Sequence, residues 1–178
     1  MLATPAPSLS ETRDNAAFDA LLWALSRPGL PRQLPEPGEG VIVGALLDRE
    51  CAVYSTDPLL IPEIMRTGAE LADIENADHV FLGALATPDP LDHVQIGSDF
   101  YPDDGATVIV RARFGSGQAL RLTGPGVDGA VTVQIGGLPD GFWKARAARL
   151  RYPMGFDLFF VDGASVLGVP RSTTAEVV

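Results

Sequence analysis

Residues 170–174 carry side chains whose types and order could bind an anion. In this segment Arg171 is followed directly by Ser172 and Thr173. A guanidinium group presents a fork of donors that suits the oxygens of a phosphate or a related anion, and neighbouring hydroxyl groups add donors. Arg27 offers a second guanidinium at the end of a predicted helix. We therefore predict an anion-binding cleft that uses these four residues. The alternative is that Arg171 ties the C-terminal tail to the rest of the fold.

The glycine-rich stretch 124–129 could bring its backbone to the same cleft. Gly124 and Gly126 carry no Cβ that would keep a ligand away. The stretch also satisfies the G-x-G-x-x-G pattern of dinucleotide-binding loops, but that role requires a helix directly after the loop. Here a β-like run, 130–135, follows, and Pro125 removes a backbone donor. We predict a turn between two strands, with Gly124 and Gly126 close to the anion.

Lys144 is the only lysine of the chain. It is therefore the only side chain that could form a Schiff base with a cofactor such as pyridoxal phosphate. The basic residues of its predicted helix and the residues just after it are Lys144, Arg146, Arg149 and Arg151. They do not share one helical stripe, which favours a solvated helix with extended side chains over a cofactor site.

Metal and nucleophile chemistry have weaker support. His79, His93 and Cys51 are widely spaced and match no zinc-binding motif. No nucleophile elbow of the G-x-S-x-G type is present. A single cysteine also excludes an intrachain disulfide. We predict no metal and no cofactor, and we assign no catalytic residue.

Apolar periodicity predicts the elements that must position these residues. A helix is expected over 14–26, capped by Asp14 or Asn15. The residues at the spacing of one face of this helix are Phe18, Leu21, Leu22 and Leu25. Residues 41–47 could be a buried strand or a buried helix. Further helices are predicted over 62–72 and 139–150, and strands over 51–55, 79–82, 106–112, 119–122 and 130–135.

The order of these elements predicts an α/β fold. Residues 156–169 read as a hairpin, because Asp162-Gly163 separates two apolar runs. Helical and strand-like runs alternate through residues 14–82, whereas the later strands are closely spaced and should pair antiparallel. We predict a flexible segment over residues 1–11 and a single domain over residues 12–178, with a mixed central β-sheet flanked by helices.

Composition limits the classes of function. The chain has 178 residues, of which 46% are hydrophobic, and this is enough for one domain with a substantial core. Its net charge of −10 argues against binding nucleic acid, because neutralising phosphates needs basic surface. The acidic excess lies in residues 1–108, so a compact anion could still bind the C-terminal part. Because no secretory leader and no membrane-spanning apolar run occur, we expect a cytoplasmic protein.

Six motifs, taken in order, resemble one known bacterial family. They are Phe18-x-x-Leu21-x-x-Ala24-Leu25-Ser26-Arg27-Pro28-Gly29, then Leu47-Asp48 before the strand Cys51–Ser55, then Pro102-x-x-Gly105-Ala106-Thr107, then Leu120-x-Leu122-x-Gly124-Pro125-Gly126, then Tyr152-Pro153-Met154-Gly155-Phe156-Asp157-Leu158, and Pro170-Arg171-Ser172-Thr173-Thr174. Each motif alone is weakly specific. Their order and spacing together resemble the PhnH family, from about residue 12 to the C-terminus.

This resemblance implies a role in phosphonate metabolism. PhnH-like proteins act in the carbon–phosphorus lyase system with PhnG, PhnI and PhnL. Together these proteins displace adenine from MgATP by an alkylphosphonate such as methylphosphonate, which gives α-D-ribose 1-methylphosphonate 5-triphosphate. The iron–sulfur enzyme PhnJ later cleaves the carbon–phosphorus bond. The resemblance also implies a homodimer, a complex with PhnG, PhnI and PhnJ, and a fold similar to the large domain of pyridoxal-phosphate-dependent transferases without their cofactor.

We therefore predict an accessory, non-catalytic subunit with no cofactor, whose anionic ligand would be a phosphonate or a nucleotide. The alternative is an autonomous enzyme with a transferase-like fold that carries pyridoxal phosphate on Lys144.

Overall fold

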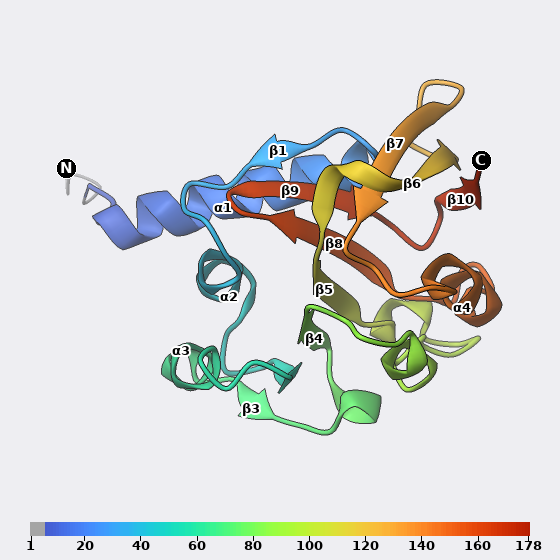
Figure 1. Cartoon of the computed structure of the whole chain (residues 1–178). Coiled ribbons are helices and arrows are strands. Elements are labelled where there is room, and N and C mark those ends of the chain that lie inside the picture. The colour runs from blue at the N-terminus through green and yellow to red at the C-terminus, as the bar shows by residue number, and fades with distance from the viewer. Residues whose placement is uncertain (1–5) are drawn as a thin grey trace.

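A mixed seven-stranded sheet forms the centre of the computed structural model, which describes residues 6–178 (Figure 1). In order across the sheet, the strands are β1 (Arg32–Gln33), β9 (Ser165–Val169), β8 (Asp157–Asp162), β5 (Thr107–Arg111), β4 (His79–Gly83), β2 (Ala52–Ser55) and β3 (Glu70–Leu71). The neighbours from β8 to β3 pair in parallel, and β9 pairs antiparallel with both β8 and β1. This arrangement confirms the predicted α/β class with a mixed sheet.

A second, three-stranded antiparallel sheet packs beside the first. Its order is β10 (Thr174–Val177), β6 (Arg113–Thr123) and β7 (Val131–Gly136). The glycine-rich stretch 124–129 joins β6 to β7, so it is a turn between strands as predicted. The expected antiparallel pairing of the later strands holds for these three but not for β5, whose partners β4 and β8 are both parallel to it.

Helices cover both faces of the large sheet. One face packs against α1 (Leu9–Ser26), α2 (Gly40–Leu46) and α3 (Ile61–Thr67), and the other face packs against α4 (Phe142–Arg149), the small sheet and the 3₁₀ turn η2 (Asp89–Asp92). Two further 3₁₀ turns are η1 (Ile74–Asn76) and η3 (Pro102–Asp104). Alternate residues of each strand face opposite sides: in β5, Val108 and Val110 enter one cluster and Ile109 the other.

Helix α1 starts earlier than predicted and packs through a different face. Ser8, not Asp14 or Asn15, is its N-cap, and Ser8 and Glu11 form a reciprocal capping box. Residues 9–11, which belong to the predicted flexible segment, are therefore helical, whereas 1–5 lie outside the described residues.

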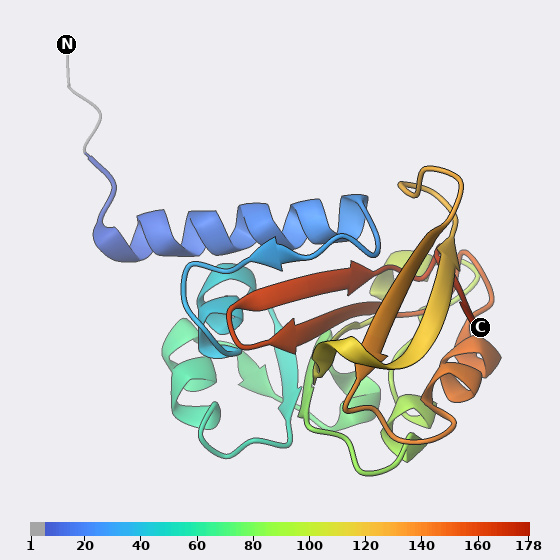
Figure 2. The same cartoon turned by 45° about the horizontal axis from the view of Figure 1, so that its top comes forward.

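The buried residues of α1 are Ala17, Ala20, Leu21 and Ala24, whereas Phe18 and Leu22 are exposed. The small side chains let α1 lie close to β9 (Figure 2). A Cβ on Gly168 of β9 would lie only 2.6 Å from the backbone carbonyl carbon of Ala24. The predicted apolar face is correct for Leu21 and, in part, for Leu25, which packs against the same core, but it is wrong for Phe18 and Leu22. Close approach to the sheet selects alanine at the remaining buried positions.

Residues 41–46 are helical, and residues 157–169 form the predicted hairpin. Residues 41–47, which could be strand or helix, form α2 up to Leu46. The predicted hairpin is present as β8 and β9, but its two-residue turn is Gly163-Ala164, because Asp162 still pairs with Ser165. Gly163 has a φ of 59°, which glycine adopts without strain. Among residues 6–178, no helix has the length and apolar character needed to cross a membrane.

Candidate functional site

Arg171 lies at the amino-terminal edge of β8 and is held by the protein itself. Its Nε and Nη2 donate to the Asp157 carboxylate, at 3.2 Å and 2.7 Å to Oδ2. Its Nη1 donates to the Pro102 carbonyl at 2.5 Å, and Nη2 to the Gly105 carbonyl at 3.0 Å. Only 15% of the side chain is exposed. These contacts correspond to the alternative role for Arg171, in which it ties the C-terminal tail to the rest of the fold instead of binding an anion.

A second arginine, which the sequence analysis did not single out as a site residue, holds the same tail. Arg146 of α4 is 2% exposed, and its two terminal nitrogens donate to the carbonyls of Thr173, at 3.1 Å, and Pro170, at 2.8 Å. Burial lowers the pKa of Arg146 to about 10, so it stays protonated at neutral pH. The predicted solvated helix is therefore wrong for this residue. Arg146 follows Phe142 by four residues and Trp143 by three, so it lies on the same face of the helix as these two buried rings. This spacing was the signal for its burial in the sequence.

The remaining residues of the predicted cleft fall into two places. Gly124 packs on the tail, where a Cβ would lie 2.7 Å from the carbonyl oxygen of Ser172. Gly126 instead packs on the backbone at the end of α1, near Arg27. The guanidinium of Arg27 is exposed and lies over the Trp23 ring, 4.8 Å from its centroid. Anion binding by these residues stays a prediction.

Lys144 lies on the exposed side of α4. Imine-forming lysines usually work in a water-excluded pocket. The position of Lys144 therefore gives the pyridoxal phosphate alternative no geometric support.

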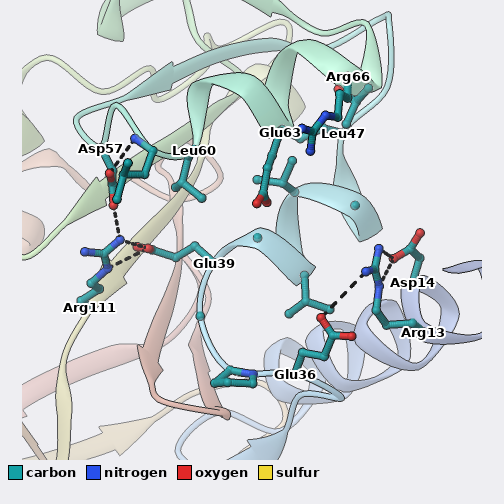
Figure 3. Close-up of a pocket in the computed structure, with 18 residues that line it drawn as sticks. Arg13, Asp14, Glu36, Glu39, Leu47, Asp57, Leu60, Glu63, Arg66 and Arg111 are labelled. Carbon is teal, nitrogen blue, oxygen red and sulfur yellow. Dashed lines mark hydrogen bonds and ion pairs between the residues drawn. The ribbon is translucent and has the colours of Figure 1, made fainter.

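A cavity of about 820 Å³ opens where strands β2 and β5 end (Figure 3). Ligands of open α/β sheets commonly bind in the crevice beyond the carboxyl ends of the parallel strands. The charged residues that line this cavity are Arg13, Asp14, Glu36, Glu39, Asp57, Glu63, Arg66 and Arg111. With five carboxylates and three guanidinium groups, the lining favours polar or zwitterionic molecules over a polyanion.

Arg111 joins two carboxylates at one wall of this cavity (Figure 3). It ends β5, and its Nε donates to Glu39 at 2.7 Å, while Nη2 donates to both Glu39 and Asp57. Glu39 directly precedes α2 and is buried. Burial raises the pKa of Glu39, although the hydrogen bonds from Arg111 oppose that rise. The Arg111 hydrogen bond lowers the pKa of Asp57.

This array is a fixed set of charges rather than a metal centre. Within residues 6–178, no group of three or more acidic, histidine or cysteine side chains is placed to hold a metal ion. Sequence patterns do not single out Glu39, Asp57 and Arg111, because residues so far apart in the chain meet only when the strands pair. The available signal was their position: Asp57 and Arg111 stand at or just after strand ends.

Replacing Glu39 with glutamine is expected to change how stability depends on pH. An acid whose pKa is raised by folding stabilises the fold below its unfolded pKa, and this contribution is lost as pH rises through its folded pKa. Measured by urea denaturation, the free energy of unfolding of Glu39→Gln should therefore improve relative to that of the parent as pH rises above the ordinary pKa of a glutamate. Glu63→Gln, which replaces an exposed glutamate of the same cavity, is the matched control for the loss of one carboxylate. Parallel pH curves for Glu39→Gln and the parent would contradict the raised pKa.

Comparisons with known proteins identify the family. The family model described as bacterial phosphonate metabolism protein (PhnH) matches residues 9–176. A curated relative from Stutzerimonas stutzeri, described as putative C-P lyase subunit protein HtxG, is 35% identical over 173 residues, which cover 90% of this chain and 85% of the relative. The match confirms the resemblance carried by the six motifs. The chain therefore belongs to the PhnH family of bacterial phosphonate metabolism proteins.

Proposed function

We propose that this protein is an accessory subunit of the carbon–phosphorus lyase system. The observation that carries the proposal is the family match over nearly the whole chain, together with a relative that is itself described as a C-P lyase subunit. In the proposed role the protein acts with PhnG, PhnI and PhnL. That assembly breaks the bond between adenine and ribose C1 of MgATP and joins C1 to an oxygen of methylphosphonate. The product is α-D-ribose 1-methylphosphonate 5-triphosphate, and adenine leaves.

The contacts of three arginine side chains favour an accessory role for this protein over a catalytic one. Arg171 and Arg146 donate to the protein's own carbonyl and carboxylate groups. Arg111 is paired with Glu39 and Asp57 in the same way. These guanidinium groups fix loops and strand ends, which is the task of a scaffold.

We further propose that the protein forms a symmetric homodimer in the cytoplasm and joins a complex with PhnG, PhnI and PhnJ. The exposed residues Phe18 and Leu22 offer apolar surface for a protein contact. Light scattering of the isolated protein should give about twice the monomer mass of 18.8 kDa. The monomer mass at micromolar concentration would contradict the dimer.

Growth on methylphosphonate as the sole phosphorus source tests the proposed function. A strain that lacks this gene should fail to grow, and the parent gene should restore growth. Lys144→Ala should restore growth equally well, because the proposal gives this exposed lysine no chemical role. Normal growth of the deletion strain would contradict the proposal. Failure of Lys144→Ala, with an aldimine absorbance band that appears only in the parent protein after pyridoxal phosphate is added, would favour the autonomous enzyme.

A further inference from the structure

Three large aromatic side chains stand exposed at one end of the molecule. Phe100 is 90% exposed, Tyr101 64% and Tyr152 73%. We call these three residues the aromatic surface. Aromatic rings usually bury most of their area, and grouped exposed rings mark sites where proteins bind one another.

The aromatic surface lies on two neighbouring loops, residues 96–105 and 150–155. The N–H of Gly155 donates to the carbonyl of Ile96 at 2.8 Å. Asp99 pairs with Arg151 at 3.1 Å, next to Phe100 on one loop and Tyr152 on the other. The two loops that carry the rings therefore lie side by side, although about 50 residues separate them in the chain.

Hydrogen bonds from two arginine side chains hold the loops that carry the rings. Arg171 donates to the carbonyls of Pro102, the first residue of the 3₁₀ turn η3, and Gly105, the residue directly after that turn. Arg149 of α4 donates to the carbonyl of Val94 at 2.8 Å. Three of the six sequence motifs, 102–107, 152–158 and 170–174, thus meet around Arg171. A surface fixed before binding loses little conformational entropy when a partner arrives.

Three exposed carboxylates flank Phe100 and Tyr101 in the same loop. We call Asp99, Asp103 and Asp104 the acidic rim; all three are exposed. An arginine can stack on an aromatic face and pair with a carboxylate at the same time, so this combination suits a basic partner. A twofold contact between two copies of this chain would instead place the acidic rim against itself. Like charges brought together in this way disfavour association.

We propose that the aromatic surface and its acidic rim are the docking site for an arginine-bearing, basic surface on another protein subunit. The inference rests on the proposed function, because it assumes that this protein works inside a multi-subunit complex. Under it, Arg171 is a positioning residue that holds the docking loops, and the phosphonate or nucleotide binds elsewhere in the assembly.

Affinity of purified variants for a complex of PhnG, PhnI and PhnJ from the same bacterium tests this inference. Phe100→Ala and Tyr152→Ala should each raise the dissociation constant about tenfold or more, as residues at the centre of an interface do. Asp103→Asn should weaken binding and reduce its dependence on salt, because a charge pair is lost. Met65→Ala, at an exposed apolar residue of α3 on the other face of the sheet, is the control and should bind like the parent. Hydrogen exchange of residues 97–104 should slow in the complex.

The outcomes separate this inference from the proposed function. Parental affinity of both Phe100→Ala and Tyr152→Ala would overturn the docking site, and so would an equal loss in Met65→Ala. Protection of residues 97–104 in the isolated protein as its concentration rises would show that a second copy occupies the surface, which also overturns the inference. If the parent protein does not bind the complex although the deletion strain needs it for growth, the docking site and the proposed complex with PhnG, PhnI and PhnJ are wrong, whereas the proposed role in phosphonate activation stands.

Discussion

Replacing Phe160 with alanine is expected to lower the free energy of unfolding by about 3–5 kcal/mol. Phe160 of β8 is fully buried, and its ring lies 5.9 Å from that of Phe142 and 5.6 Å from that of Trp143. These two residues form the inner face of α4, so the change leaves a cavity where this helix packs on the sheet. The same helix carries Arg146, and its displacement would also loosen the C-terminal tail.

Urea denaturation of the parent and of Phe160→Ala measures this loss. Phe100→Ala is the matched control, because it removes an equally large ring that is 90% exposed. Its free energy of unfolding should stay within about 0.5 kcal/mol of the parent. A loss below about 1 kcal/mol for Phe160→Ala would show that this ring cluster does not anchor α4.

Arg171→Ala is expected to lower the free energy of unfolding by about 3 kcal/mol, because it leaves the mostly buried Asp157 carboxylate without its guanidinium partner. The carbonyls of Pro102 and Gly105 also lose their donors. Affinity for PhnG, PhnI and PhnJ should fall with the stability, since the aromatic surface loses its support. Arg27→Ala, at an exposed arginine of the predicted cleft, is the control and should leave the melting temperature nearly unchanged.

The same variant decides between the two roles that the sequence left open for Arg171. Calorimetric titration of the parent with methylphosphonate and with MgATP shows whether the tail binds an anion at all. Weaker anion binding by Arg171→Ala, with an unchanged melting temperature, would favour the cleft. A large fall in melting temperature, with no anion affinity in the parent, would leave Arg171 as a structural tie alone.

Local patterns predicted the fold where one pattern dominated. The hairpin of β8 and β9 follows from two apolar runs around a glycine, and the turn 124–129 follows from its glycines. The orientation of α1 did not follow, because the helix is apolar on more than one face. The spacing of the large apolar residues favoured burial of Phe18 and Leu22. Close contact with Gly168 instead required small side chains such as that of Ala24. Only the position of β9, set by the sheet, decides between these faces.

Side chains that act together were harder to predict, because their neighbours come from distant parts of the chain. The sequence singled out Arg171 by its type, but its partner Asp157 and the carbonyl of Pro102 depend on how loops and strands pack. The cavity wall of Glu39 and Arg111 depends on strand order in the same way. Exposure of Phe100 could not be predicted either, since a short apolar segment in a loop is as consistent with burial as with a binding surface.

Adenine release is the most direct measure of the central claim, that this protein is a required accessory subunit in phosphonate activation. Purified PhnG, PhnI and PhnL are incubated with MgATP and methylphosphonate, with and without this protein, and free adenine is quantified by chromatography. The proposal predicts that adenine forms only when this protein is present, and that Lys144→Ala supports the same rate as the parent. Adenine release at an equal rate without this protein would contradict the claim.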